Sequence, residues 1–152
     1  MVTIHFDLHF NSFIVDGAIH NAAGKELYNY CRKLGGCLVG QAKITPGFKL
    51  PAKYILHTVG PIGEDAVLLN DCYNSCLNLA AENNVRTLAF CCISTGIYGY
   101  PNRQAANVAL RAVRTWLETP GNASKVDLVV FCTFLDKDKL IYNDLIKKYF
   151  PK

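Results

Sequence analysis

Apolar and polar residues follow two periods along this chain, and each period predicts a different kind of element. Strict alternation over residues 2–10 predicts a half-buried strand. Short apolar runs at residues 54–59, 87–93 and 126–134 predict further strands. The run at 87–93 is almost wholly apolar, as expected of a central strand that is covered on both faces.

Helical spacing of apolar residues separates these strands. It predicts helices over residues 16–34 and 65–82, between Pro101 and Pro120, and over residues 136–150. Gly35-Gly36 is expected to end the first helix, and residues 39–49 read as an irregular or strand-containing connection. The last helix is expected to begin with three solvated residues, Asp136, Lys137 and Asp138. Its buried face is expected to hold Leu140, Ile141, Leu145, Ile146 and Tyr149.

Alternating strands and helices predict an α/β sandwich with a largely parallel or mixed sheet. The 152 residues fit one domain, residues 1–152, and no repeat or linker interrupts them. In such sheets ligands bind beyond the carboxyl ends of the strands. The residues from Ser94 to Tyr98 and those just after Phe134 both lie at such ends.

Composition narrows the class of protein. An apolar fraction of 51% with 18% charged residues is typical of a globular chain. The net charge of +4 suits an anionic small ligand, and without a run of basic residues a nucleic acid is not expected as partner. No apolar run is long enough for a membrane span, and no signal peptide is visible. We expect a monomer.

The seven cysteines are odd in number, form no C-x-x-C motif and lie mostly in apolar periodic segments. They therefore indicate a reducing compartment, which is the cytoplasm or the nucleus. No cluster completes a metal site, so neither a metal nor another cofactor is expected.

The segment from Ser94 to Pro101 carries the first chemical signal. Its Ser-Thr-Gly-x-x-Gly pattern leaves a strand and opens a helix, so backbone N–H groups and a helix N-terminus could hold a phosphate, with Tyr98 as a flat face for a sugar or base. The other interpretation is a turn that needs glycine only for its dihedral angles. The local pattern leaves both open.

Three segments together resemble the macrodomains of the MacroD type, which bind ADP-ribose. Their motifs are Val15-Asp16-Gly17-Ala18-Ile19-His20, the stretch Gly40–Pro61 with its Gly47-Phe48 and His57-Thr58-Val59-Gly60-Pro61, and Ile93-Ser94-Thr95-Gly96-Ile97-Tyr98-Gly99-Tyr100-Pro101. The resemblance covers most of the chain from Ile14 onward. It implies a three-layer α/β/α sandwich with a mixed sheet.

The resemblance also implies a function and a set of site residues. MacroD-type enzymes remove mono-ADP-ribose from acidic side chains and deacetylate O-acetyl-ADP-ribose. The loop of Ser94, Thr95, Gly96, Ile97 and Tyr98 would wrap the diphosphate, with backbone amides from Gly96 and Ile97 and with Tyr98 against the distal ribose. Val15, Asp16 and Gly17 would form the facing wall, and Phe134 could border the adenosine. Asp16 is the candidate catalytic residue.

Two histidines and Asp16 also have structural interpretations. Asp16 is either the N-cap of the first helix or a group that orients the water or the ribose, and the two roles are compatible. His20 is expected to be packed or supporting rather than catalytic. His57, in the middle of an apolar strand, is expected to be a structural histidine.

The chain departs from the MacroD pattern before Val15. MacroD-type domains carry an Asn-Ala-Ala-Asn stretch and a run of glycines there, whereas this chain has Asn11-Ser12-Phe13-Ile14. A lost oxyanion-type donor typically costs about 100–1,000-fold in rate. Residues 2–10 are expected to take the place of the missing central strand, so the N-terminal strand region is atypical. Three functions stay open: an ADP-ribosyl ester hydrolase, an ADP-ribose-binding module without turnover, and a degenerate interaction domain.

Overall fold

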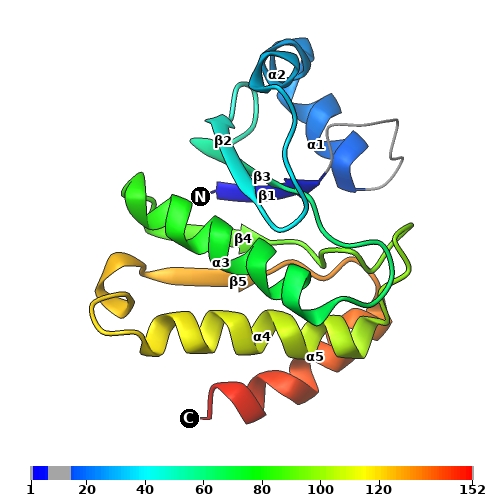
Figure 1. Ribbon diagram of the computed structural model, residues 1–152, viewed down its shortest axis with the longest axis vertical. Helices are drawn as coiled ribbons and strands as arrows, with labels where there is room; N and C mark the ends of the chain where they lie inside the picture. Colours follow the sequence, from blue (N-terminus) through cyan, green and yellow to red (C-terminus); the bar gives the residue numbers. More distant parts are fainter. Residues whose placement is uncertain (1, 7–14, 152) are drawn as a thin grey trace.

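The computed structural model describes residues 2–6 and 15–151 of the chain, and its five strands form one mixed sheet (Figure 1). The order across the sheet is β2-β3-β1-β4-β5. The strands are β1 (Val2–Phe6), β2 (Ala42–Pro46), β3 (Tyr54–Thr58), β4 (Thr87–Phe90) and β5 (Leu128–Phe131). All neighbours pair in parallel except β2, which is antiparallel to β3. The mixed sheet expected from the sequence is confirmed.

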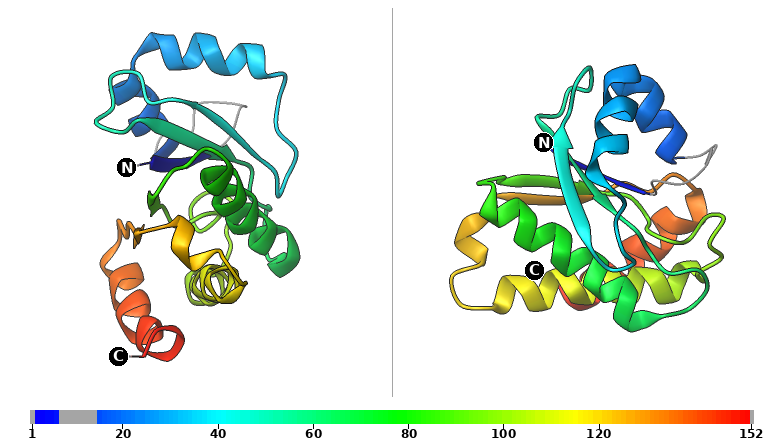
Figure 2. Two further views of the ribbon diagram at one scale, coloured as in Figure 1. Left: turned by 90° about the vertical axis from the view of Figure 1, so that its left-hand side faces the viewer. Right: turned by 45° about the horizontal axis from the view of Figure 1, so that its top comes forward.

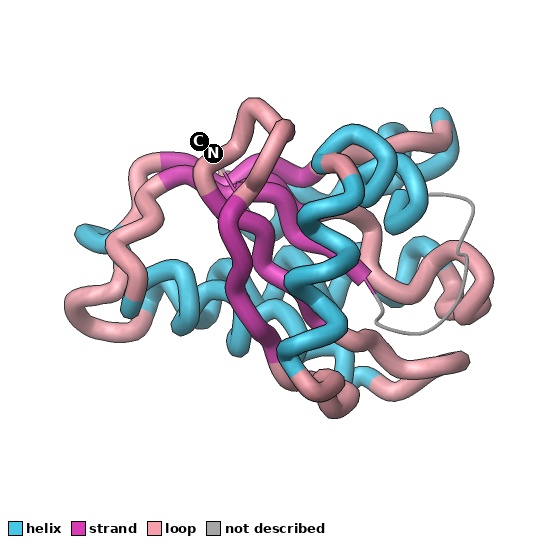
Figure 3. Tube along the Cα trace, turned by 90° about the horizontal axis from the view of Figure 1, so that it is seen from above, coloured by secondary structure: helices cyan, strands magenta, loops and turns pink. Residues whose placement is uncertain are grey.

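Helices cover both faces of the sheet, which confirms the three-layer sandwich (Figure 2). One layer holds α1 (Val15–Ala23) and α2 (Lys25–Cys31), followed by the short 3-10 helix η1 (Arg32–Leu34). The opposite layer holds α3, α4 and α5, and Figure 3 gives the same arrangement from above. Their bounds, with those of the short η2, are Ala66–Glu82, Asn102–Glu118, Asp136–Tyr149 and Ala123–Lys125.

The two layers bury cores of different size. The larger core lies between the sheet and the α3–α4 layer, where the rings of Tyr73 and Phe90 stand 5.0 Å apart. The smaller core lies under α1 and α2 and joins Ile55 to four apolar helix residues: Ile19, Ala23, Leu27 and Cys31. Ile55 and its neighbour Leu56 face opposite layers, as alternation along a strand requires.

The helix predicted over residues 16–34 is broken in the structure. Gly24 adopts a φ of +87°, in the left-handed region, and separates α1 from α2. The N–H of Leu27 donates to Gly24 O at 3.2 Å, while the carbonyl of Ala23 accepts instead from the N–H of Lys49 at 3.2 Å. A tertiary contact from the β2–β3 turn thus replaces a helical hydrogen bond, which periodicity could not show.

Both long apolar runs make shorter strands than predicted. The run at 87–93 leaves the sheet after Phe90, and the run at 126–134 forms only β5. β5 is an edge strand on which Leu128 and Val130 stay 55% and 37% exposed. An apolar run indicates a strand but not its place in the sheet. The strand predicted over 2–10 is confirmed for residues 2–6, and residues 7–10 lie outside the described part.

The last helix has the predicted extent but a different inner face. Tyr142 and Leu145 are buried, whereas Leu140 is 70% exposed and Ile146 is 40% exposed. Asp138, expected to be solvated, is buried. Its carboxylate accepts a hydrogen bond from the Asn102 side-chain amide at 2.6 Å, which ties the start of α5 to the start of α4. No helix in the described residues is both long and apolar enough to cross a membrane.

Gly47 provides a test of the β2–β3 turn. A Cβ at this position would stand 1.8 Å from Ala52 O, so the backbone would have to move. We expect Gly47→Ala to lower the free energy of unfolding by about 3 kcal/mol in urea denaturation. Gly36→Ala is the matched control: its φ of +87° is strained for alanine but its Cβ meets no atom within 4 Å, so the loss should be about 1 kcal/mol. Equal losses would contradict the clash.

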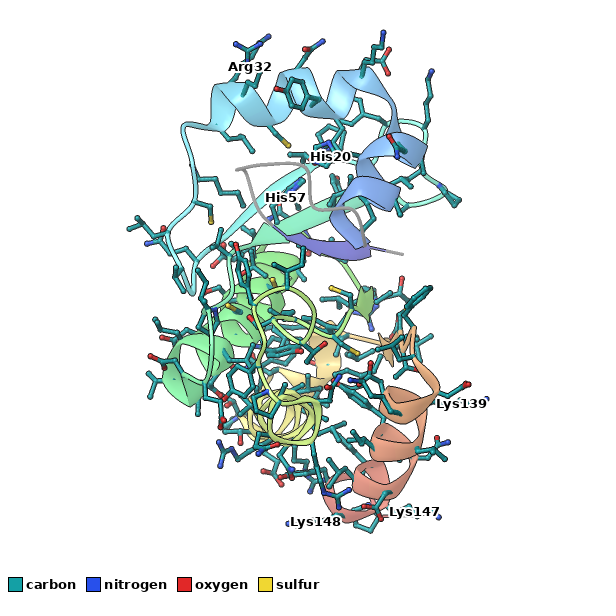
Figure 4. All side chains as sticks on the ribbon, turned by 90° about the vertical axis from the view of Figure 1, so that its right-hand side faces the viewer. His20, Arg32, His57, Lys139, Lys147 and Lys148 are labelled. Atoms are coloured by element: carbon teal, nitrogen blue, oxygen red, sulfur yellow. The ribbon has the colours of Figure 1, made fainter. Side chains whose placement is uncertain are left out.

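His57 gives the fold a pH dependence. It is buried in β3 with Nε2 2.9 Å from Thr45 Oγ1, and His20, a residue of α1, lies near it (Figure 4). Burial, and secondly the charge of His20, lower the pKa of His57 from 6.5 to about 4. Burial also lowers the pKa of His20.

Because the unfolded chain takes up this proton near pH 6.5 and the folded chain only near pH 4, stability is full above pH 6.5. It should fall by about 3 kcal/mol as the pH drops from 6.5 to 4. Urea unfolding at several pH values measures the slope. His57→Gln should flatten it between pH 6.5 and 4, and an unchanged slope would assign the effect to other groups.

Candidate functional site

The four parallel strands end at one edge of the sheet, and the segments that follow them gather there (Figure 1). After β1 the chain reaches α1 on one face, whereas after β4 it reaches α4 on the other. Adjacent strands whose connections leave on opposite faces create the crevice in which α/β proteins bind ligands. The candidate site lies at this edge, where the sequence placed it.

The loop between β4 and α4 is folded by its own hydrogen bonds. Tyr100 N donates to Ser94 O at 2.9 Å, and Gly99 N donates to Gly96 O at 3.0 Å. The Thr95 hydroxyl donates to Cys92 O at 3.0 Å. Ser94 and Gly99 adopt φ values of +64° and +68°. A non-glycine residue in the left-handed region is strained and clusters at functional sites.

Three polar groups of this loop have no partner among the described residues. They are the N–H groups of Gly96 and Ile97 and the hydroxyl of Ser94, which is 7% exposed. Buried polar groups are normally hydrogen-bonded, so the lone Ser94 hydroxyl indicates a missing acceptor or donor. Gly99 needs glycine for its dihedral angles, as the turn interpretation held, but Gly96 does not have a positive φ. The turn interpretation therefore applies to Gly99 but does not explain Gly96.

Neighbouring segments tie this loop to the edge. Gly63, in the segment after β3, donates its N–H to Tyr98 O at 2.7 Å. The sequence reasoning missed Gly63, although the run Gly60-Pro61-Ile62-Gly63 marks a turn. On the other side, Cys92 Sγ lies 3.8 Å from Cys132 O, which connects the loop to the segment that carries Phe134.

The remaining predicted site residues take these positions. Val15, Asp16 and Gly17 form the first turn of α1, whose N–H groups favour an anion. Because the helix includes Val15, Asp16 lies within the first turn rather than at the N-cap. Tyr98 is half-buried, whereas Ile97 and Phe134 are 73% and 80% exposed, so both apolar side chains are open to a ligand. Residues 7–14, where the chain departs from the MacroD pattern, lie outside the described part.

Electrostatics limit the chemistry at this edge. Burial raises the pKa of Cys91 and of Cys92 to about 12, so both are thiols at neutral pH rather than nucleophilic thiolates. No group of three or more metal-ligating side chains occurs in residues 2–6 and 15–151. Among the described groups of the loop, the backbone N–H groups of Gly96 and Ile97 are free to bind an anion.

The fold and the loop define an α/β protein that can hold a phosphate at the carboxyl edge of its sheet. Comparison with known proteins identifies it more closely: the Macro domain model matches residues 12–109, and the chain belongs to this family. The MacroD-type resemblance is confirmed. ADP-ribose glycohydrolase MACROD2 of Xenopus laevis is 55% identical over 144 residues, and ADP-ribose glycohydrolase MACROD1 of Mus musculus is 50% identical over 143 residues.

These alignments include 91% and 90% of this chain but only 34% and 44% of those relatives, so the chain spans less than half of either. A solved Trypanosoma brucei macrodomain in complex with ADP-ribose is 39% identical, with a TM-score of 0.90. That comparison covers 95% of this chain and 62% of the other. The macrodomain fold is therefore established.

The buried Ser94 hydroxyl leads to a stability prediction. Without ligand, Ser94→Ala removes an unpartnered buried polar atom, so we expect the free energy of unfolding to rise by about 1 kcal/mol. Urea denaturation measures it. Thr95→Ala is the control, because it removes a hydroxyl that is hydrogen-bonded and should be neutral or destabilising. A loss of stability in Ser94→Ala would show that the hydroxyl has a partner.

Proposed function

We propose that this chain binds ADP-ribose at the carboxyl edge and hydrolyses the ester that joins it to an acidic side chain, or the ester of O-acetyl-ADP-ribose. The observation that carries the proposal is the pair of unpartnered N–H groups at Gly96 and Ile97, beside the buried Ser94 hydroxyl. Two adjacent amides that already face no acceptor can bind a diphosphate without breaking a hydrogen bond. The relatives named above support ADP-ribose as the anion.

The other site residues fit parts of this ligand. The first turn of α1, with Val15, Asp16 and Gly17, offers helix N-terminal amides across the crevice. Tyr98 has a half-buried ring for the distal ribose, and the exposed ring of Phe134 can border the adenosine. An apolar ring that is open to solvent gains most when a flat ligand covers it.

Hydrolysis needs a positioned water as well as a bound diphosphate. Water attacks at the ester, the bond to the carboxylate breaks, and ADP-ribose and a free carboxylate leave. Asp16 is the carboxylate assigned to this step, because it lies in the first turn of α1 at the site's edge. It would orient the water, and the substrate's own phosphate can take the proton, so a strong protein base is not required.

A second function is favoured by one observation. The Asn-Ala-Ala-Asn stretch and the glycine run that precede Val-Asp-Gly in MacroD-type domains are not found before Val15, where this chain has Asn11-Ser12-Phe13-Ile14. The asparagine that the resemblance assigns to the distal ribose is therefore lacking there. A module that binds ADP-ribose without turnover would keep the Ser94–Tyr98 loop but would not hydrolyse the ester. An interaction domain that binds no nucleotide is the third alternative.

Binding is tested by removing one amide. Ile97→Pro deletes the N–H, whereas Ile97→Ala keeps it and removes only the exposed side chain. Because a hydrogen bond to a charged group contributes about 1.5–3 kcal/mol, calorimetry should show ADP-ribose affinity about 10–100-fold weaker in Ile97→Pro and nearly unchanged in Ile97→Ala. Circular dichroism confirms that both fold. If the wild type releases no heat at millimolar ADP-ribose, the chain is an interaction domain.

Turnover is tested on a protein that carries mono-ADP-ribose on a glutamate. The wild type should release ADP-ribose, measured by loss of the radiolabel, and Asp16→Asn should slow release at least about 100-fold. If Asp16 orients water, calorimetry will show that the variant still binds ADP-ribose. Tight binding by the wild type without release would establish the binding module instead.

A further inference from the structure

The α1–α2 layer and the β2–β3 hairpin carry an excess of positive charge that the whole-chain value hides. Residues 17–63 hold six Lys and Arg but one carboxylate, Glu26, whereas residues 64–151 hold nine of each sign. The net charge of +4 therefore describes neither half. The fold separates these halves, so the charge asymmetry becomes a property of one side of the molecule.

Four exposed cations form what we call the basic face. They lie on α2, on η1 and in the β2–β3 turn: Lys25, Arg32, Lys33 and Lys49. The turn packs against the helix end, because Lys49 N donates to Ala23 O and the Lys49 side chain lies beside Gly24. Lys25 and Arg32 are seven residues apart along the helix, or about 10 Å. The cations therefore lie at both ends of α2.

Carboxylates do not neutralise this face within the described residues. The three ion pairs found there join Arg86 to Asp127, Arg103 to Asp144 and Arg114 to Glu118, all in the other half of the chain. Of the other two cations in residues 17–63, Lys43 donates to Leu34 O, and Lys53 Nζ lies 5.1 Å from the ring centroid of Tyr54, which packs against the larger core. Cations left without carboxylates in an ordered surface produce a positive potential that attracts a polyanion.

Aromatic rings are interleaved with these cations. Tyr28 and Tyr30 on α2 are 59% and 41% exposed, and Tyr30 meets Phe48 of the turn with ring centroids 5.9 Å apart. Cations with exposed aromatic faces among them are the combination that binds single-stranded nucleic acid, in which phosphates meet the charges and unpaired bases stack on the rings.

We infer that the basic face binds single-stranded nucleic acid. Paired bases in a duplex cannot reach the tyrosine rings, and an acidic peptide would use the charges without the aromatic faces. The inference does not depend on the proposed function, because the face lies on α2 and the hairpin rather than in the loop after β4. The small net charge of the whole chain predicts no nucleic-acid partner, but it does not include the positions of the charges, which the structure supplies.

The experiment measures fluorescence polarisation of a labelled 12-nucleotide oligouridylate between 50 and 200 mM salt. If the strand contacts four of the cations, the slope of log K against log salt should be about −2.8, a loss of about 50-fold across this range. Lys25→Gln/Lys49→Gln removes two contacts, so the slope should fall to about −1.4. Tyr28→Ala/Tyr30→Ala should keep the slope and weaken binding at least about tenfold.

The matched control is Lys139→Gln/Lys147→Gln, which removes the same charge from α5. These exposed lysines lie at the opposite end of the molecule from Arg32 (Figure 4). The control should keep the wild-type slope and affinity. ADP-ribose affinity should stay unchanged in Lys25→Gln/Lys49→Gln. Failure of the proposed ADP-ribose site and failure of the basic face therefore give different results.

Three results would overturn the inference. The first is an equal loss of affinity in the α5 control, which would show a general charge effect. The second is competition by a duplex of the same length as strong as by the single strand. The third is equal competition by polyglutamate or by anionic phosphatidylserine vesicles, which would assign the face to an acidic peptide or a membrane surface.

Discussion

The parallel alignment of β3, β1, β4 and β5 is the constraint on which the rest of this structure depends. Because these strands run the same way, every segment that leaves their carboxyl ends arrives at one edge. β1 is the strand that joins the two halves, since it pairs with β3 on one side and β4 on the other. The start of α1 and the loop after β4 lie at the same edge of the sheet for this reason, although about 80 residues separate them in the sequence.

Packing in the larger core fixes the position of the loop that forms the candidate site. Ile93 and Tyr100, which bracket the loop after β4, are 1% and 3% exposed in the core beneath α3 and α4. The loop between them is thereby fixed at both ends, and internal hydrogen bonds close it. Its unpartnered amides are held in place before a ligand arrives, which is what electrostatic preorganisation requires. The strained φ of Ser94 is maintained by the same burial.

Much of the fold could be predicted from local pattern, and much of the site from motif order. The helix over residues 65–82 is predicted by the helical spacing of its apolar residues. The structure adds that Asp65 caps it, accepting hydrogen bonds from the N–H groups of Val67 and Leu68. The structure confirms that the Ser94–Tyr98 loop lies at the carboxyl edge and that His57 is a buried strand residue. The predicted solvent exposure of Asp138 is wrong, because Asp138 is buried and hydrogen-bonded to Asn102, a residue 36 positions away. The roles of Asp16 and Phe134 stay predictions.

The sequence by itself determined which segments are strands and helices, and which loop is rich in glycine, because these follow from spacing between near neighbours. Only the tertiary structure decided that the helix over 16–34 breaks at Gly24, that the run at 126–134 is an exposed edge, and that Lys49 of the turn lies beside the start of α2. Each of these depends on contacts or on positions between segments distant in the chain, such as Lys49 with Ala23. The periodicity of apolar residues describes one segment at a time, so it does not predict which segments contact each other in the fold.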